Sequence, residues 1–455
     1  IDVPGHEKFV KNMMSGASSI DIVILVIAAD DGIMPQTIEH FEILKILDIK
    51  KGIIVINKID LVESEWIDMI KEDIKALVKS SFLEGSNILL SSAERGDGID
   101  QIKDEIMSVC ASISHKNDTG IFRMHIDRVF SKSGFGTVVT GTIVSGQVKL
   151  GDTLDLIPSN DTLRVRGIQS HGENVESASC GDRAAINLSN INAVNLKRGY
   201  HLSKVNSYAE KNKFVAKITT VDSYDNTIKN NQRVRVHLGT KEVISRISII
   251  NKNKNEMILL FRLENSMVAA LNDRFIVRMF SPVKTIAGGK IIYIPYDDTW
   301  EDIKNNSIRL ENLNQHDSVH ELINIYCRNH ALNMNDIEKI LNISLENFNK
   351  ILSIDKRYEQ ISYKSFTWVI NRTRLDEFEK NIIDTLDSFH KENPLSDGCN
   401  KNIILQKTKL EDNLMLYLLE KLSSESIIKK ISENWSIFNF KISIDKEMNI
   451  TVEKI

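Results

Sequence analysis

The sequence predicts a multidomain chain in which an α/β domain comes first, two β-barrels follow and helical modules come last. Three observations predict this order. Up to about residue 115, apolar strand-like runs alternate with amphipathic helices. From about residue 122 to 294 the apolar residues recur with a period of two, and helical periodicity returns after about residue 300. A chain of 455 residues is long enough for about three or four domains of ordinary size.

Composition excludes several classes of protein. Hydrophobic residues make up 42% and charged residues 26%, which is typical of globular chains and argues against wholesale disorder. No apolar run reaches the roughly 18 residues that a membrane span needs, so no membrane association is expected. The 58 Lys and Arg residues are balanced by 62 Asp and Glu, so any RNA contact must come from local patches. Four scattered cysteines without Cys-x-x-Cys spacing predict a reduced, cytoplasmic protein without a structural metal.

Three apolar runs in the first part of the chain predict strands of a parallel sheet. They cover residues 22–29, 52–56 and 87–90, and they are rich in Ile, Val and Leu, as strands buried on both faces are. Pro35 opens a predicted helix that continues to Leu47, with Ile38, Phe41 and Leu44 on one side. Polar residues follow each strand directly. Because ligands of open α/β sheets bind beyond the carboxyl ends of the strands, a binding site is predicted there.

The chain opens on Asp2-Val3-Pro4-Gly5-His6. The Asp2 carboxylate in such an Asp-x-x-Gly motif can hold a water on Mg²⁺, and Gly5 lets a backbone N–H approach a terminal phosphate. His6 occupies the place where Ras-type GTPases keep the glutamine that orients the attacking water. By itself the motif is also compatible with an ordinary turn.

The second motif, Asn57-Lys58-Ile59-Asp60, follows the second predicted strand. The Asp60 carboxylate can accept two hydrogen bonds from guanine, whereas adenine offers no matching pair of donors. Lys58 is expected to lie along the base, and the loop at Ser92 and Ala93 to present a backbone N–H to the guanine oxygen. A solvated turn explains one such motif alone. Three motifs in this order predict the guanine-nucleotide half of a P-loop-type GTPase domain that uses GTP, GDP and Mg²⁺.

These motifs also carry a family resemblance. Asp2-Val3-Pro4-Gly5-His6 is the form found in translational GTPases of the EF-Tu class. The continuation from Glu7 to Met13, then Ile20-Asp21 and the stretch 31–37, resembles the bacterial selenocysteine-specific elongation factors, the SelB family. The resemblance implies a GTPase that brings selenocysteinyl-tRNA to the ribosome at recoded UGA codons. It implies a cytoplasmic monomer whose C-terminal winged helices bind an mRNA hairpin, through a site that this sequence need not contain.

Other motifs of such a GTPase domain are absent from this sequence. No Gly-x-x-x-x-Gly-Lys-Ser/Thr stretch occurs, so the first strand, the phosphate loop and the first switch are missing. We therefore expect these 455 residues to bind GTP poorly and to hydrolyse it negligibly, as in a truncated sequence. Two alternatives stay open: a nucleotide-incompetent adaptor that binds RNA or tRNA, and a general EF-Tu-like GTPase.

Residues 117–300 are predicted to form the two barrels. By resemblance to the SelB family, Asp127, Arg128 and Arg183 line an aminoacyl pocket in the first barrel. A selenol is more acidic than a thiol, whose pKa is about 8.5, so selenocysteine is expected to be anionic where serine is neutral. Two guanidinium groups would favour that anion, with Asp127 holding one of them in place. The alternative is that Asp127 and Arg128 form a surface ion pair on a strand.

The C-terminal part shows a repeated pattern of three helices and two short strands. This pattern predicts two winged-helix modules, a nucleic-acid-binding variant of the helix-turn-helix. Lys401, Lys407 and Lys409 are candidates for phosphate contacts, although a lysine-bearing helix face is more often simply solvated. The predicted domains are 1–116 (partial GTPase), 117–206 and 207–300 (barrels), and 301–372 and 373–455 (winged helices).

Overall fold

The computed structural model describes residues 20–113, 118–132, 136–189, 191–222, 224, 228–253, 256–296, 298–311, 313 and 315–442. The chain divides into two compact units. The first contains the chain up to residue 315 together with residues 338–344, and the second contains residues 316–337 and the chain from 345 onward. Among the described residues, no helix combines the length and the apolar character that a membrane crossing requires.

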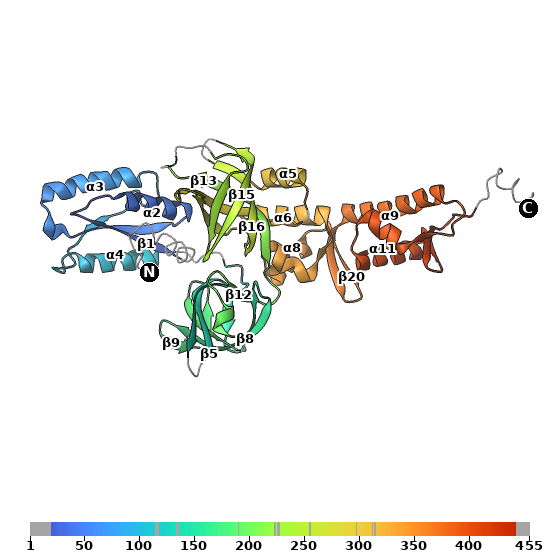
Figure 1. Ribbon diagram of the computed structural model, residues 1–455, viewed down its shortest axis with the longest axis horizontal. Coiled ribbons are helices and arrows are strands. Elements are labelled where there is room, and N and C mark those ends of the chain that lie inside the picture. Colours follow the sequence, from blue (N-terminus) through green and yellow to red (C-terminus); the bar gives the residue numbers. More distant parts are fainter. Residues whose placement is uncertain are drawn as a thin grey trace, which may run out of the picture. The chain divides into compact units, whose positions relative to one another are not determined.

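The first unit begins with a parallel sheet of three strands in the order β1 (Ile22–Ala28), β2 (Lys51–Asn57) and β3 (Ile88–Leu90). All three lie where the apolar runs predicted strands. Figure 1 shows α3 (Ser64–Val78) and α4 (Ile99–Ala111) on opposite sides of this sheet. Helix α3 buries Ile67, Ile70, Ile74 and Val78, whose spacing of three and four residues forms one apolar stripe.

Helix α2 (Pro35–Ile46) begins at the predicted proline and has two buried sides. Phe41 packs in the core between the sheet and α3, whereas Ile43 and Leu44 pack with Ile276 of the second barrel. The prediction that Ile38 shares a buried side with Phe41 and Leu44 is wrong, because Ile38 is 38% exposed. The surface that buries Ile43 comes from residues more than 200 positions later, which local periodicity cannot show.

The first barrel is a ring of antiparallel strands in the order β11-β5-β4-β12-β7-β8, closed by pairing of β8 with β11. Its core contains five fully buried side chains, those of Met124, Ile126, Val139, Ile186 and Leu202. The strands and short elements of this region are β4 (Arg123–Lys132), β5 (Gly136–Ser145), β6 (Gln147–Lys149), β7 (Thr153–Ile157), β8 (Asp161–Ser170), β9 (Glu173–Val175), β10 (Ser177–Ser179), β11 (Arg183–Leu188), η3 (Ala193–Asn195) and β12 (His201–Lys204).

The second barrel is closed in the order β13-β16-β15-β14-β17-β18. Phe214, Phe261 and Phe275 meet in its core with ring centroids 5.1–5.2 Å apart. Its strands are β13 (Glu210–Thr220), β14 (Arg233–Leu238), β15 (Lys241–Lys252), β16 (Glu256–Val268), β17 (Arg274–Met279) and β18 (Thr285–Tyr293). Helix α5 (Trp300–Leu310), which starts with a capping box of Thr299 and Asp302, packs against β15 and β18.

A buried ion pair joins the two barrels. The Arg123 guanidinium of β4 donates two hydrogen bonds to the Asp273 carboxylate, which directly precedes β17, and one of them is 2.8 Å long. Asp273 also accepts from the backbone N–H of Ala270 at 2.8 Å, and the Arg123 guanidinium lies 5.1 Å from the Tyr208 ring centroid. Both charges are therefore paired away from water, which fixes the contact between the barrels.

Residues 338–344 dock on both barrels, although they lie among the C-terminal helices in sequence. The Glu338 carboxylate accepts hydrogen bonds from Lys204 Nζ (2.9 and 3.0 Å) and Ser207 Oγ (2.6 Å). Asn342 Oδ1 accepts from the backbone N–H of Leu271 at 3.0 Å. We call residues 338–344 the docking segment. It explains why these residues belong to the first unit.

The second unit repeats one arrangement, with a helix, a short strand, further helices and a hairpin. Its sheets have the orders β19-β21-β20 and β22-β24-β23, and Trp368, Ile382 and Leu418 lie in one core. The elements of the C-terminal part are α6 (Gln315–Asn329), β19 (Leu332–Asn333), η4 (Met334–Asp336), α7 (Ile337–Leu341), α8 (Leu345–Ile354), β20 (Tyr358–Tyr363), β21 (Phe366–Asn371), α9 (Arg372–Glu392), β22 (Cys399–Asn400), α10 (Lys401–Thr408), α11 (Asp412–Ser424), β23 (Ile428–Ile431) and β24 (Asn434–Ile437). This order matches the predicted one, and its interpretation as two winged helices stays a prediction.

Candidate guanine-nucleotide site

Three loops meet at the carboxyl ends of β1, β2 and β3. Asp30 follows β1, Asn57 ends β2, and Ser91 and Ser92 follow β3. The parallel register pairs Ala28 with Asn57, so the first two loops leave the sheet side by side. The motifs that the sequence placed at strand ends therefore lie at one edge of one sheet, which is where ligands of open α/β sheets bind.

Asn57 ties two of these loops together. Its side-chain Oδ1 accepts hydrogen bonds from the backbone N–H of Ala93 at 3.1 Å and from the Ser91 hydroxyl at 3.2 Å. The backbone N–H of Ile59 donates to the Ser91 carbonyl at 3.3 Å. Asn57 thus fixes the position of the loop at Ser92 and Ala93 relative to the Asn-Lys-x-Asp loop.

Lys58 has an aspartate partner that the sequence did not reveal. Its Nζ lies 2.7 and 3.0 Å from the two carboxylate oxygens of Asp30, and this hydrogen bond raises the pKa of Lys58 and lowers that of Asp30. The Lys58 backbone has φ of +61°, a left-handed conformation that turns the chain sharply after β2. The available signal was that Asp30 follows a neighbouring strand at the same edge.

Asp60 lies next to Ser92. A hydrogen bond with Ser92 is the main cause that lowers the pKa of Asp60, so its carboxylate is ionised at neutral pH. Ser92 is fully buried, its backbone N–H donates to the Asp97 carbonyl at 3.0 Å, and its hydroxyl accepts from the N–H of Arg95 at 3.2 Å. The loop therefore presents a charged acceptor beside a rigid turn, a combination suited to reading the donors of a guanine base.

The structure brings Asn57, Lys58, Asp60, Ser92 and Ala93 together. Asp2, Gly5 and His6 lie outside the described residues, so the structure gives no position for them. In the described part of the chain, no cluster of three or more acidic, His or Cys side chains could hold a metal ion.

A second group of predicted residues lies on the first barrel. Asp127 Oδ2 lies 2.7 Å from Arg183 Nη1, and Asp127 Oδ1 accepts a hydrogen bond from the Thr140 hydroxyl at 2.7 Å. The Asp127 side chain is 13% exposed and that of Arg183 is 45% exposed. Arg128 is exposed and forms no ion pair with a carboxylate of the described residues. Asp127 thus pairs across strands with Arg183, and Thr140 is a partner that the sequence did not indicate.

A β-bulge sets the direction of the Asp127 side chain. The register between β4 and β5 shifts between Ile126 and Arg128, so Asp127 is the extra residue on β4. Bulges redirect side chains and occur often beside functional sites. Simple alternation along the strand therefore misplaces the residues that follow Ile126.

Three protein-family models match the chain. They are the Elongation factor Tu GTP binding domain over residues 1–112, Elongation factor Tu domain 2 over 136–203, and the Selenocysteine-specific elongation factor, beta-barrel domain, over 215–296. The third model separates the chain from general elongation factors of the EF-Tu class.

Curated relatives of the chain are named selenocysteine-specific elongation factors, as the third family model is. The selenocysteine-specific elongation factor of Desulfomicrobium baculatum is 40% identical over 296 residues, covering 64% of this chain and 47% of that protein. The Escherichia coli (strain K12) factor is 27% identical over 425 residues, covering 93% of this chain and 67% of that protein. This chain thus spans about half to two thirds of the length of these relatives.

Solved structures give the same result. A bacterial selenocysteine-specific elongation factor, EF-Sec, superposes with a TM-score of 0.79 at 27% identity, covering 100% of this chain and 71% of that one. SelB from Methanococcus maripaludis, solved in complex with the GTP analogue GPPNHP, has a TM-score of 0.60 at 29% identity, covering 66% of this chain and 71% of that one. The chain belongs to the family of selenocysteine-specific elongation factors.

Proposed function

We propose that this chain serves in a translation elongation factor that delivers selenocysteinyl-tRNA to the ribosome at recoded UGA codons, with GTP binding and hydrolysis as the switch in the full-length protein. One observation carries the proposal. Asn57, Asp60 and Ser92, which lie on two separate loops, are held together at the carboxyl edge of the sheet by hydrogen bonds. That arrangement suits a guanine base, and the family membership gives the cycle in which the base is used.

Each residue at this edge has a proposed role in nucleotide binding. The Asp60 carboxylate accepts hydrogen bonds from the two donors of guanine, and its lowered pKa keeps it an acceptor at neutral pH. The Ala93 backbone N–H, which donates to Asn57 Oδ1 in this structure, would donate to the guanine oxygen when the base is bound. Lys58, anchored by Asp30, lies along the base. Asn57 holds the two loops at the spacing that the base requires.

Three further groups complete the proposed GTPase site. Asp2 would hold Mg²⁺ through a water, Gly5 would approach the terminal phosphate, and His6 would position the attacking water. When bound, Mg²⁺ neutralises charge on the phosphates. The proposed cofactors are therefore GTP or GDP and Mg²⁺.

The proposed aminoacyl pocket contains Asp127, Arg128 and Arg183. Asp127 is held by Thr140 and in turn holds Arg183, so one guanidinium has a fixed position from which it can face an anionic selenolate. Arg128, exposed and without a described carboxylate partner, would supply the second positive charge. A neutral serine hydroxyl gains less from both cations, which gives selectivity for selenocysteine.

The proposed partners are selenocysteinyl-tRNA, the ribosome and an mRNA hairpin. The two barrels would bind the tRNA, and the repeated helix-and-hairpin modules of the second unit would bind the hairpin. We propose a cytoplasmic monomer, as expected for this class of factor.

The guanine site is tested by changing Asp60 to Asn. The amide replaces an acceptor by a donor, so the variant should lose guanosine diphosphate affinity by at least about tenfold, the value of a charged hydrogen bond, and gain affinity for xanthosine diphosphate. Fluorescence titrations of the whole chain with both nucleotides, extended to millimolar concentrations, measure the change. Asp100→Asn removes the same charge from an exposed position on α4 and should leave both affinities unchanged.

An unchanged preference in Asp60→Asn would contradict the proposed role of Asp60. Failure of the unmodified chain to prefer guanosine over adenosine diphosphate would contradict the guanine site itself and would favour an RNA-binding adaptor.

A further inference from the structure

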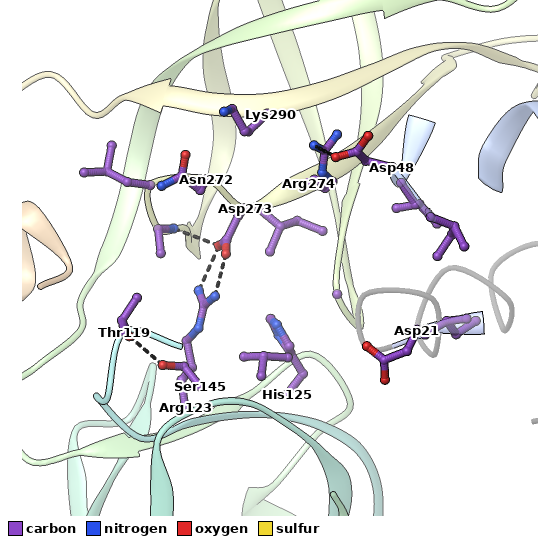
Figure 2. A pocket seen from close by; sticks show the side chains of 18 of the residues that line it. Asp21, Asp48, Thr119, Arg123, His125, Ser145, Asn272, Asp273, Arg274 and Lys290 are labelled. Atoms are coloured by element: carbon purple, nitrogen blue, oxygen red, sulfur yellow. Dashed lines mark hydrogen bonds and ion pairs between the residues drawn. The ribbon is translucent and has the colours of Figure 1, made fainter. Parts of the chain in front are cut away.

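A cavity lies within the first unit (Figure 2), and none of the guanine-site residues lines it. Its walls come from the α/β part, from the first barrel and from the second barrel. Its volume of about 670 Å³ falls within the roughly 300–1,000 Å³ of small-molecule sites. Figure 2 shows Arg123 and His125 on one side of it and Asn272 and Lys290 on another.

Positive charge exceeds negative charge on the walls of this cavity. Five Lys and Arg side chains and three Asp side chains line it. Arg123 is paired with Asp273, while Arg274 and Lys50 share the single carboxylate of Asp48. His125 adds no charge at neutral pH, because burial lowers its pKa to about 3. The walls therefore carry two positive charges in excess.

Lys290 lies at the centre of a row of like charges. On β18 it is directly opposite Lys217 of β13 on one side and Arg274 of β17 on the other. Like charges directly opposite each other in a sheet are destabilising. Lys217 forms an ion pair with Glu256 at 2.9 Å, and Arg274 forms one with Asp48, so each of these two charges is balanced by a carboxylate.

Lys290 itself lacks such relief. Its ammonium makes no ion pair or hydrogen bond with another described residue, and the side chain is half-buried. Burial is the main cause that lowers its pKa, the charges of Arg274 and Lys217 lower it further, and the charge of Asp48 offsets part of this. A half-buried ammonium between two other cations is an arrangement that an anion would stabilise.

We infer that this cavity binds the phosphate group of a small phosphate monoester, with Lys290 as the principal contact. The dianion matches the excess of two positive charges, and a lysine ammonium binds phosphate as a point charge. Asn272, which also lines the cavity, offers an amide donor. Ile49 and Leu271 on the walls accept an apolar body. Because the walls come from three parts of the fold, the bound molecule stabilises their contact.

Calorimetric titration of the whole chain with inorganic phosphate and with phenyl phosphate tests this site. We expect saturable binding of one molecule per chain, tighter for phenyl phosphate because its ring reaches the apolar wall. Lys290→Gln should weaken binding by at least about tenfold, since it removes the charged contact. Lys290→Arg should keep affinity within about threefold, because the charge remains.

Lys252→Gln is the matched control, since Lys252 is exposed on β15 and does not line the cavity. It should bind both probes as the unmodified chain does. Absence of saturable binding to the unmodified chain would overturn the inference. So would equal affinities of Lys290→Gln and the unmodified chain, or a comparable loss in Lys252→Gln.

Discussion

Thr140 determines how the charges of the proposed aminoacyl pocket are held. Its hydroxyl donates to one oxygen of Asp127, and the other oxygen contacts Arg183. Asp127 is the extra residue of a β-bulge, so its side chain needs a partner that fixes its direction. Thr140 supplies that partner. The position of the Arg183 guanidinium thus depends on a side chain that need not touch the amino acid.

Replacing Thr140 by Val should weaken binding of selenocysteinyl-tRNA by about three- to tenfold, the value of one hydrogen bond to a charged group that is partly exposed. Binding of seryl-tRNA should stay unchanged, because a neutral side chain gains little from Arg183. Thr140→Ser should retain full discrimination. Equilibrium binding of both aminoacyl-tRNAs measures the effect.

Thr162→Val is the control for this prediction, since it removes a similar hydrogen bond to Asp155 on an exposed part of the barrel. Equal losses for both aminoacyl-tRNAs in Thr140→Val would show that the residue supports the barrel and not selectivity.

His125 makes stability depend on pH. Burial, and next the charge of Arg123, lowers its pKa to about 3, whereas an unfolded histidine titrates near 6.5. Between these values the unfolded chain binds a proton that the folded chain does not. The stabilisation is thus complete above pH 6.5 and is lost as pH falls toward 3. In His125→Leu, the urea midpoint should fall less steeply between pH 7 and 4.5 than in the unmodified chain.

The exposed His171 provides the comparison, because His171→Leu removes a histidine that is not buried. Parallel pH profiles for His125→Leu and the unmodified chain would show that the proton uptake occurs elsewhere.

At the scale of the element, α2 connects the α/β part to the second barrel. Its Glu39 accepts a hydrogen bond from Thr285 Oγ1 at 2.8 Å, and Arg274 Nη1 of β17 donates to the Ile46 carbonyl at 3.2 Å. Gly288 of β18 permits this approach. A Cβ atom there would lie 2.2 Å from Ile46 Cγ2 and 2.7 Å from the Phe275 carbonyl oxygen.

Gly288→Ala should therefore destabilise the chain by about 1–3 kcal/mol, the range for overpacking in a closely packed contact. The clash involves a backbone atom, which cannot turn away. Chemical denaturation measures the free energy of unfolding. Gly167→Ala is the matched control on β8, because its Cβ would meet only Asn187 Cβ at an ordinary 3.8 Å. Similar stabilities of the two variants would contradict the close contact of α2 with β18.

Local patterns predicted the elements well. The strands β1, β2 and β3, the start of α2 at Pro35 and the order of the C-terminal elements follow from short-range periodicity and turn residues. The same patterns placed Asn57, Asp60 and Ser92 at strand ends. They did not reveal Asp30 as the partner of Lys58 or Thr140 as the partner of Asp127, because each pair joins different strands. The second buried side of α2 was missed for the same reason.

At the scale of the whole molecule, the docking segment belongs to the first unit, although the residues before and after it belong to the second. Glu338 is buried and holds Lys204 and Ser207. Glu338→Gln keeps the shape of the side chain but removes the charge that pairs with Lys204, so the first unit should lose about 1–2 kcal/mol of stability. Hydrogen exchange at the backbone amides of 338–344 should become faster.

Glu346→Gln removes an exposed carboxylate paired with Lys350 on α8 and should change neither quantity. Unchanged exchange in Glu338→Gln would mean that Asn342 and apolar packing hold the docking segment without the carboxylate.

The docking segment also limits how the polypeptide can be dissected. A recombinant fragment that stops at residue 315 would strip Lys204, Ser207 and the Leu271 amide of their partners, while a fragment starting at 316 would carry Glu338 and Asn342 with nothing to receive them. Each fragment would therefore expose polar groups that are hydrogen-bonded in the whole chain. Adding residues 338–344 as a separate synthetic peptide should therefore raise the free energy of unfolding of the N-terminal fragment.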